Sequence, residues 1–223
     1  QIMRRVRQVR QPERFGGWLR SVVNRMAINR ATRRRPVASA DPLVLSAAVY
    51  PIAGARARAN DRFGPLPPTG DSMEFMKTAV YHDEKGDIQL VWDYQAIRWM
   101  QDNIQGSPVI IEGLTPFYRW GARVSVYTGL PDVFGWDWHE RQQRWDYQFM
   151  IDERIRDVND FYTTTDVSYA MALLQKYGVK YVYVGRVEQL YYPASGIAKF
   201  DQMAGNQLER VHHNEQVTIY RVK

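Results

Sequence analysis

Apolar residues recur with the period of a helix near the start of the chain. They follow the spacing i, i+3, i+4, i+7, i+8 and i+11 of one helical face, and they are Phe15, Trp18, Leu19, Val22, Val23 and Met26. Arg14, Arg20 and Arg25 lie off this face, so the pattern predicts a basic amphipathic helix within an arm of residues 1–35. Such a helix can serve as a nucleic-acid arm, as a membrane-surface segment or as a helix packed on a globular domain.

A second apolar stretch occupies residues 36–57. Within it, Leu43 to Ala55 is apolar apart from Ser46. At a helical rise of about 1.5 Å per residue, this run covers only about two-thirds of a hydrocarbon core about 30 Å thick. We interpret the stretch as the remnant of a membrane helix. The alternative is a buried hydrophobic linker in a soluble protein.

Residues 58–72 are rich in residues that break regular structure. Gly64, Pro65, Pro67, Pro68 and Gly70 are typical of a linker or an ordered loop. A soluble α/β domain is expected to follow at residues 73–223.

Hydrophobic periodicity predicts three helical regions in that domain. The first covers residues 93–104, and the second covers residues 140–162 as one long helix or a pair. The third begins after Thr165 or Asp166 and ends at Gly178, which suits a left-handed C-cap. We expect its buried face to consist of Tyr169, Ala172, Leu173 and Tyr177.

Short apolar runs between these helices predict strands. They lie at residues 109–112, 124–127 and 179–184, and a terminal hairpin pairs 208–212 with 217–222. Helices that alternate with strands before a hairpin indicate an α/β layered domain with a small mixed sheet.

The positive charge of the chain is concentrated in its first 40 residues. They hold eleven arginines and one glutamate, whereas the other 183 residues hold 19 Lys and Arg against 23 Asp and Glu. Arginines that precede an apolar segment tend to stay in the cytoplasm, which would place the residues after the segment outside. The main domain is acidic, so we expect no nucleic-acid partner.

Common catalytic and metal-binding motifs are absent from the sequence. It has no cysteine, which excludes disulfides, thiolate metal sites and cysteine nucleophiles. It also has no G-x-G-x-x-G, Walker A, G-x-S-x-G, H-E-x-x-H or D-x-D motif. The nearest approach to a metal cluster has a spacing that matches no familiar site, and it consists of Asp132, Asp137, His139 and Glu140. We therefore expect no metal and no cofactor.

Tryptophan is concentrated in one region of the domain. Six of the seven tryptophans lie between residues 92 and 145, among arginines, carboxylates and a histidine. Flat aromatic faces stack on the C–H faces of sugars, while nearby polar groups bond hydroxyls or phosphate. The candidate ligand-binding residues of this block are Tyr118, Arg119, Tyr127, Trp136, Trp138, His139, Glu140 and Arg144. The alternatives are that the rings form part of the core or a partner interface.

Two glutamates follow predicted strands and complete the candidate site. Glu112 ends the strand at 109–112, and Glu188 comes shortly after the strand at 179–184. Side chains beyond the carboxyl ends of strands often carry function in α/β folds, and two converging carboxylates can act as acid and base. The alternative is a structural pairing with Arg119, Arg123 or Arg144. No complete catalytic set is identified.

Five segments of the sequence resemble one protein family. They are Tyr50-Pro51, GDSMEFM at 70–76, AIRWMQDNIQGSPVIIEG at 96–113, RVSVYTGLPDVFGWDWHERQQR at 123–144 and LLQKYGVKYVYVGRVEQLYY at 173–192. Across residues 42–223 the chain resembles the C-terminal extracytoplasmic portion of the YYY-type polytopic membrane proteins. The TGLP-x-x-x-GW-x-x-H block at 128–139 is the most specific segment, whereas TGDSM at 69–73 stands where the family has TLDGM.

The resemblance implies a role in glycosyl transfer. The family is similar to integral-membrane glycosyltransferases that use polyprenyl-phosphate sugars. The resemblance also implies an extracytoplasmic domain at the cell membrane. Its partners would be a lipid-linked sugar or glycan acceptor and the membrane part of the same protein. The catalytic carboxylates of such enzymes are expected in loops between membrane helices, so this chain alone is expected to be inactive. The alternative is a non-catalytic structural or assembly domain of a membrane protein.

Overall fold

The computed structural model describes residues 50–62 and 69–223, in two units that comprise residues 1–65 and 66–223 of the chain. The predicted amphipathic helix and most of the apolar stretch 36–57 lie outside the described residues. In the first unit, a π-helical turn, η2 (Tyr50–Gly54), leads into helix α4 (Ala55–Arg62). Neither this helix nor any other in the described ranges has the length and apolar character needed to cross a bilayer.

The predicted linker at 58–72 differs from the structure at both of its ends. Helix α4 continues to Arg62, so the linker's first five residues are helical. The residues that break helices begin only at Gly64, which explains how the helix extends this far. At the other end, Asp71 accepts a hydrogen bond from the backbone N–H of Met73 at 3.0 Å and pairs with Arg98. The chain is therefore held on the second unit from Asp71 onward.

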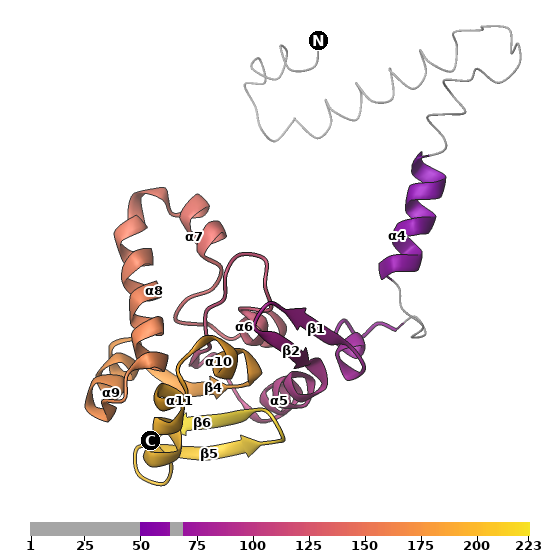
Figure 1. Cartoon of the computed structure of the whole chain (residues 1–223). Helices are drawn as coiled ribbons and strands as arrows, with labels where there is room; N and C mark the ends of the chain where they lie inside the picture. The colour runs from indigo at the N-terminus through magenta and orange to yellow at the C-terminus, as the bar shows by residue number, and fades with distance from the viewer. Residues whose placement is uncertain (1–49, 63–68) are drawn as a thin grey trace, which may run out of the picture. The chain divides into compact units, whose positions relative to one another are not determined.

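A four-stranded mixed sheet lies at the centre of the second unit (Figure 1). Its first two strands are parallel, and the remaining pairs are antiparallel. In spatial order the strands are β3 (Val109–Ile111), β4 (Val179–Val184), β6 (Thr218–Val222) and β5 (Leu208–His213). This confirms the predicted α/β class with a mixed sheet and a C-terminal hairpin.

Alternating strand residues pack into two separate cores, one on each face of the sheet. Ile111 and Val182 pack with residues of α8 (Gln148–Thr163), α9 (Val167–Lys176) and α11 (Ala194–Met203). Ile110 and Tyr183, their sequence neighbours, pack with residues of α5 (Leu90–Asn103) and α6 (Arg123–Thr128). Successive side chains of a strand point to opposite faces, so these apolar runs require helices on both sides.

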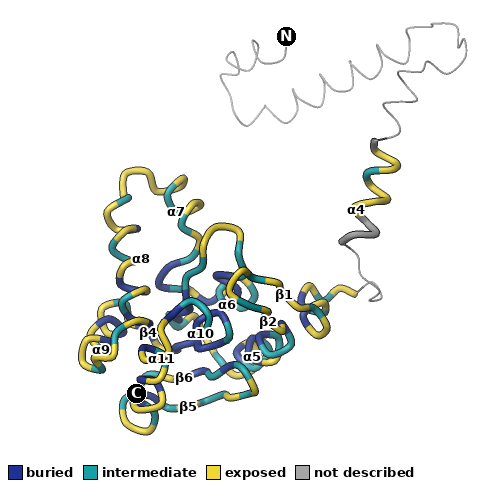
Figure 2. The backbone as a smooth tube through the Cα atoms, viewed as in Figure 1, coloured by how far each residue is buried: buried dark blue, intermediate teal, exposed yellow. Residues whose placement is uncertain are grey.

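A small hairpin completes the domain and was not predicted. Strand β1 (Val80–Asp83) pairs with β2 (Gly86–Gln89) in antiparallel fashion. A third core joins this hairpin to the start of the domain and to α10 (Arg186–Tyr191) through Met76, Ile88, Leu90, Ile97 and Val187. Figure 2 shows buried residues in strands β4 and β6 and in α10, whereas α7 (Asp137–Gln143) and the adjoining end of α8 are largely exposed.

Most predicted elements are confirmed within a few residues. The region 140–162 is a pair of helices, α7 and α8, joined by a short 3-10 turn, η4 (Trp145–Tyr147). Helix α9 has Asp166 as its N-cap, and the Asp166 carboxylate accepts hydrogen bonds from the N–H groups of Ser168 and Tyr169. Gly178, just beyond α9, has a φ of +63°, as the predicted left-handed cap requires.

The predicted buried face of α9 is partly wrong. Leu173 is buried and Tyr177 is half-buried, but Tyr169 and Ala172 are exposed. Ala170 and Leu174 are buried instead, because α8 and the sheet contact a face rotated by about one residue.

The strand predicted at 124–127 is wrong: these residues belong to helix α6. Val124 and Val126 favour a strand by local preference, but the helix obtains its N-cap from a distant residue. The Glu112 carboxylate accepts hydrogen bonds from the N–H groups of Val124 at 3.1 Å and Ser125 at 2.9 Å. Tertiary contacts therefore outweigh the strand propensity of β-branched residues at this position.

Candidate functional site

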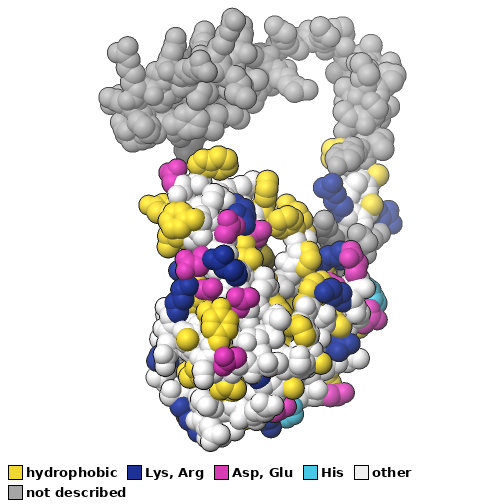
Figure 3. Space-filling model, turned by 60° about the vertical axis from the view of Figure 1, so that its left-hand side comes forward, with side chains coloured by type: hydrophobic (Ala, Val, Ile, Leu, Met, Phe, Trp, Pro, Cys, Tyr) yellow, Lys and Arg dark blue, Asp and Glu magenta, His cyan; other side chains and the backbone are white. Residues whose placement is uncertain are grey.

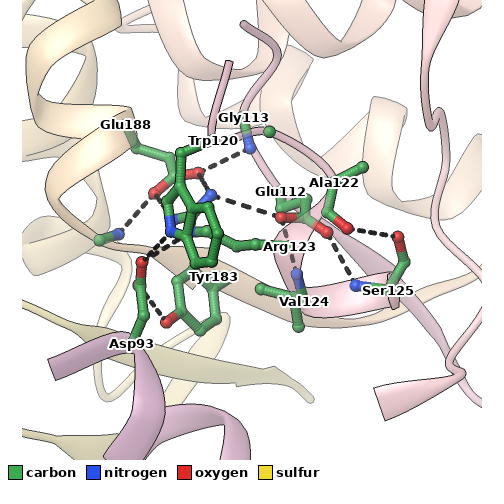
Figure 4. Close-up of polar contacts among 12 residues, drawn as sticks. Asp93, Glu112, Gly113, Trp120, Ala122, Arg123, Val124, Ser125, Tyr183 and Glu188 are labelled. Atoms are coloured by element: carbon green, nitrogen blue, oxygen red, sulfur yellow. Dashed lines mark hydrogen bonds and ion pairs between the residues drawn. The ribbon is translucent and has the colours of Figure 1, made fainter. Parts of the chain in front are cut away.

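A buried arginine organises the centre of the second unit (Figure 4). Arg123, the first residue of α6, contacts three carboxylates: its Nε lies 3.0 Å from Asp93, and its guanidinium nitrogens lie 3.3 Å from Glu112 and 2.9 Å from Glu188. The guanidinium also lies over the Tyr183 ring, 4.9 Å from its centroid. None of the five side chains is more than 2% exposed. This geometry corresponds to the structural pairing considered for Glu112 and Glu188, with Arg123 as the partner.

Further donors satisfy the oxygens of these carboxylates. Glu188 accepts hydrogen bonds from the backbone N–H groups of Gly113 at 2.8 Å and Gly185 at 2.7 Å. Asp93 accepts from the Tyr183 hydroxyl at 2.7 Å and from the Trp120 indole at 2.9 Å. The cluster thereby ties the ends of strands β3 and β4 to helices α5, α6 and α10.

Burial and neighbouring charges shift the pKa values of Arg123, Glu112 and the nearby Asp132. Burial disfavours the charge of Arg123, but the surrounding carboxylates, Asp93 first, outweigh it and raise its pKa. Burial raises the pKa of Glu112 to about 7 against the opposing effect of Arg123. Burial and the charge of Glu112 also raise the pKa of Asp132, whose Oδ2 is buried without a hydrogen-bond partner among the described residues. Near neutral pH the Glu112 carboxyl is therefore partly protonated.

A cavity of about 590 Å³ opens beside this cluster. Four stretches of chain line it, namely the loop before α6, the start of α7 with the residues just before it, part of α8, and the end of α10. The lining residues are Leu114, Thr115, Pro116, Phe117, Tyr118, Arg119, Gly121, Ala122, Phe134, Gly135, Trp136, Asp137, Trp138, His139, Ile155, Asn159, Tyr191 and Tyr192. Aromatic rings make up much of this surface, which is typical of sites for small ligands with flat apolar faces.

The loop before α6 is held in an unusual conformation. Tyr118 and Ala122 have φ values of 60° and 53°, a region that residues other than glycine adopt only at a cost of about 1 kcal/mol or more. A Cβ at Gly121 would meet the Thr115 hydroxyl at 2.3 Å, so the loop folds tightly on itself there. The Trp136 indole donates a hydrogen bond to the Gly121 carbonyl at 3.2 Å and links this loop to the α7 segment.

The cavity brings five of the predicted site residues together. Tyr118, Arg119, Trp136, Trp138 and His139 all line it. Trp136 and Trp138 are each 49% exposed, so both rings are accessible from the cavity. Arg119 forms an ion pair with Glu84, which lies in the turn between β1 and β2.

The other five predicted residues do not line the cavity. Glu112 and Glu188 are buried in the Arg123 cluster, where they support the cavity wall from behind. Tyr127 packs against Trp120, with 6.2 Å between their ring centroids. Glu140 and Arg144 form an ion pair with each other along α7. These five side chains therefore contact other protein groups and do not face the cavity.

Two polar groups of the cavity were not predicted. The Tyr192 hydroxyl accepts a hydrogen bond from the Leu114 N–H at 2.9 Å and lies 3.1 Å from the Asn159 side-chain oxygen. Asn159 is in α8 and Tyr192 follows α10, so no local pattern connects either residue with the aromatic block. Only the packing of α8 and α10 around the loop brings them to the site.

The cavity suits binding better than acid–base chemistry. Among the described residues that line it, Asp137 is the single carboxylate, and it pairs with Arg141. Phe117 and Trp138 are in edge contact, with centroids 6.2 Å apart, and Trp136 lies 5.5 Å from the His139 ring. Within the described ranges no group of three histidine or acidic side chains could hold a metal ion.

Comparisons with known proteins yield only remote structural likenesses. No protein-family model and no curated protein sequence matches the chain. Among solved structures, the C-terminal globular domain of an oligosaccharyltransferase from Archaeoglobus fulgidus aligns with 58% of this chain and 95% of its own, at 15% identity and a TM-score of 0.37.

Proposed function

We propose that residues 66–223 form a glycan-binding, extracytoplasmic domain of a membrane glycosyltransferase that uses lipid-linked sugars. The observation that carries this proposal is the cavity of about 590 Å³ walled by Phe117, Trp136 and Trp138. Indole and phenyl faces bind the C–H faces of sugar rings, and the His139 ring and the Asn159 amide can bond hydroxyl groups. The resemblance of residues 42–223 to the YYY-type membrane proteins supports the same function.

The domain would position a substrate while the chemistry takes place elsewhere. The two glutamates that could have served as acid and base are held by Arg123 in the interior. We therefore expect the purified 223-residue chain to transfer no sugar from polyprenyl-phosphate donors. Turnover by the isolated chain would contradict this part of the proposal.

Glycan binding can be tested on a glycan array with the full chain and two tryptophan variants. Trp138 lines the cavity, whereas Trp145 is 79% exposed and lies outside the cavity lining, so Trp145→Ala is a matched control. We expect at least one class of neutral glycan to bind the wild-type chain and Trp145→Ala, and Trp138→Ala to weaken this binding at least tenfold. No retained glycan, or equal loss in both variants, would overturn the proposal.

A folding measurement must accompany the binding assay. Truncation of a fully buried tryptophan lowers the free energy of unfolding by roughly 3 to 5 kcal/mol. Because Trp138 is 49% exposed, Trp138→Ala should lower it by less than about 2 kcal/mol. One denaturant titration separates these cases. A larger loss for Trp138→Ala would assign the ring to the core and remove it from the ligand surface.

The proposed location can be tested independently of binding. Ser195 is exposed on α11, and the chain has no cysteine, so Ser195→Cys offers a single label site in these residues. In intact cells that make the full-length protein, an impermeant thiol reagent should label this position. Protection until the cells are lysed would place the domain in the cytoplasm.

The second candidate function is a non-catalytic structural or assembly domain of a membrane protein. The burial of Glu112 and Glu188 favours it, because a purely structural domain needs no free acid–base pair. Under this alternative the aromatic cavity would hold part of another protein, and the array would retain no glycan.

A further inference from the structure

A cluster of exposed hydrophobic side chains occupies the junction of α7 and α8. Trp145 and Tyr147 lie in the η4 turn, and Phe149 and Met150 lie in the first turn of α8. Their exposed fractions are 79%, 55%, 68% and 41%, in that order. We call these four residues the aromatic tip. Figure 3 shows hydrophobic side chains gathered at the upper end of the domain, where α7 and α8 meet.

The turn that carries the tip is braced by polar contacts. The Gln148 side chain donates to the Arg141 carbonyl at 3.0 Å and accepts from the Arg141 guanidinium at 3.1 Å. Arg141 also pairs with Asp137 and Asp152, which connects the two helices. Further along α8, Ile151 and Val158 are buried in the core. The tip is thus a preformed projection and does not need to be ordered upon binding.

We infer that the aromatic tip inserts into the headgroup region of a lipid bilayer. Tryptophan and tyrosine are enriched at membrane–water interfaces, because their rings are apolar and their N–H and O–H groups remain hydrated there. Contiguous exposed apolar groups on a soluble domain mark an interaction site. Trp145 and Tyr147 provide the amphipathic rings, and Phe149 and Met150 provide apolar groups without a polar end.

The area of the tip fits a bilayer better than a second copy of the chain. From the sizes of these side chains and their exposed fractions, the four residues offer roughly 500 Å² in total. A stable protein–protein interface buries about 800 Å² on each partner. Four side chains at a projecting turn fall short of that value, whereas shallow insertion into lipid requires no complementary surface.

The charges around the tip indicate which lipids it would meet. Arg141 and Arg144 are both paired with carboxylates of the protein. Residues 137–152 hold four acidic side chains against these two arginines, so the surroundings of the tip carry a net negative charge; the four are Asp137, Glu140, Asp146 and Asp152. An acidic surface is repelled by anionic lipids, so binding should depend on the rings and should persist on zwitterionic phosphatidylcholine.

Insertion of the tip would hold the cavity close to the membrane surface. The seven residues of α7 separate Trp136 from the tip by roughly 10 Å, at about 1.5 Å per residue. A sugar attached to a membrane lipid lies within such a distance. This consequence concerns the proposed glycan site, but contact between the tip and lipid does not depend on glycan binding.

The test places one environment-sensitive fluorophore on the otherwise cysteine-free full chain. Tyr147→Cys carries the probe at the tip, and Ser195→Cys carries it at an exposed control position on α11. Vesicles of phosphatidylcholine, with and without phosphatidylglycerol, contain a spin-labelled lipid that quenches at headgroup depth. We expect quenching at position 147 on both vesicle types and none at position 195. The position-specific signal separates the tip from membrane binding by the arginine-rich arm.

Three results would overturn the inference. The first is a probe at position 147 that stays unquenched although the chain is bound to vesicles. Binding to anionic vesicles through the arm alone would give this result. The second is failure of the chain to bind phosphatidylcholine vesicles. The third is a concentration-dependent change of the probe without vesicles, which would identify a second copy as the partner.

A pair of variants provides an independent measurement. Trp145→Ser combined with Phe149→Ser should lower partitioning into phosphatidylcholine vesicles at least tenfold, because two rings lose their lipid contact. Tyr169→Ser removes an exposed ring from α9, away from the tip, and should leave partitioning unchanged. Equal partitioning of the double variant and the wild type would contradict the inference. Glycan binding without vesicles, measured on the same proteins, tests the proposed function separately.

Discussion

Arg123 and Glu188 face each other in the interior, with Nη2 2.9 Å from Oε2 and neither side chain exposed to solvent. The pair connects the start of α6 with α10, two elements that flank the cavity. Glu188 also binds the N–H of Gly113, just before the loop that lines the cavity. The wall of the candidate site therefore depends on a buried charge cluster behind it.

Replacement of Arg123 should be severely destabilising. Arg123→Met leaves Asp93, Glu112 and Glu188 buried without their cation, and loss of one partner of a buried ion pair costs roughly 3 to 5 kcal/mol. Denaturant titration measures this change. Arg221→Met is the matched control, because Arg221 pairs with Glu209 on the surface and should give little change. Similar stabilities of the two variants would show that the cluster contributes little to folding.

The raised pKa of Glu112 should make stability depend on pH. The pKa of Glu112 is about 7 in the folded chain, against a usual value of 4.5, so the folded state keeps a proton that the unfolded state has released. Its contribution to the free energy of unfolding is therefore fully present below about pH 4.5 and is lost as the pH rises through about 7. Denaturant titrations at pH 5 and pH 8 should show this loss in the wild type and a smaller one in Glu112→Gln. Carbon-13 NMR of the carboxyl group should show titration near pH 7, and a midpoint near 4.5 would contradict the prediction.

Lys199 should have the opposite effect from Glu112, because it should make the free energy of unfolding rise with pH in the alkaline range. Its ammonium group is buried beside Phe161 and Phe200 and donates to the carbonyls of Phe161 at 2.5 Å and Gly196 at 2.9 Å. In the part of the chain that the structure describes, it has no carboxylate partner. Burial lowers its pKa from 10.5 to about 8. The folded chain releases this proton first, so the free energy of unfolding should rise between about pH 8 and 10.5.

The comparison with Lys199→Met isolates this effect from tyrosine titration. At pH 7 the wild type bears the cost of the buried charge, of the order of 3 kcal/mol for a pKa shift of this size. The difference in stability between the two proteins, followed from pH 7 to 9.5, should change in favour of the wild type. A difference that stays constant with pH would rule out a depressed pKa for Lys199.

Gly196 should be intolerant of any side chain. A Cβ at this position would lie 2.2 Å from the Tyr162 carbonyl oxygen and 2.7 Å from that of Thr163, both of them backbone atoms at the end of α8. Gly196→Ala must therefore push α11 away from α8, at a cost of roughly 1 to 3 kcal/mol or more. Gly70→Ala, which meets no atom within 4 Å, should leave the denaturation midpoint nearly unchanged. Equal midpoints for the two variants would mean that α11 has room to move.

Local patterns predicted the elements whose signals lie within a few neighbouring residues. Asp166 caps α9 through the two N–H groups that follow it, and Gly178 supplies the left-handed turn at its end. The apolar run of β4 and the alternation of the terminal hairpin identify strands in the same way. The sequence also showed an aromatic block rich in polar groups, and five of its eight candidate ligand-binding residues line the cavity.

The remaining features depend on residues that are distant along the chain. Val124 to Tyr127 form a helix because Glu112, on another element, accepts their first N–H groups, and no local window contains that information. In the sequence, Glu112 and Glu188 both follow strands and have the pattern of free carboxylates. In the folded chain, Arg123 lies between them and pairs with both. The sequence alone therefore determined which residue types and which local elements are present. Only the tertiary structure decided which carboxylates are neutralised in the interior and which aromatic rings remain exposed, because burial and pairing depend on contacts between distant segments.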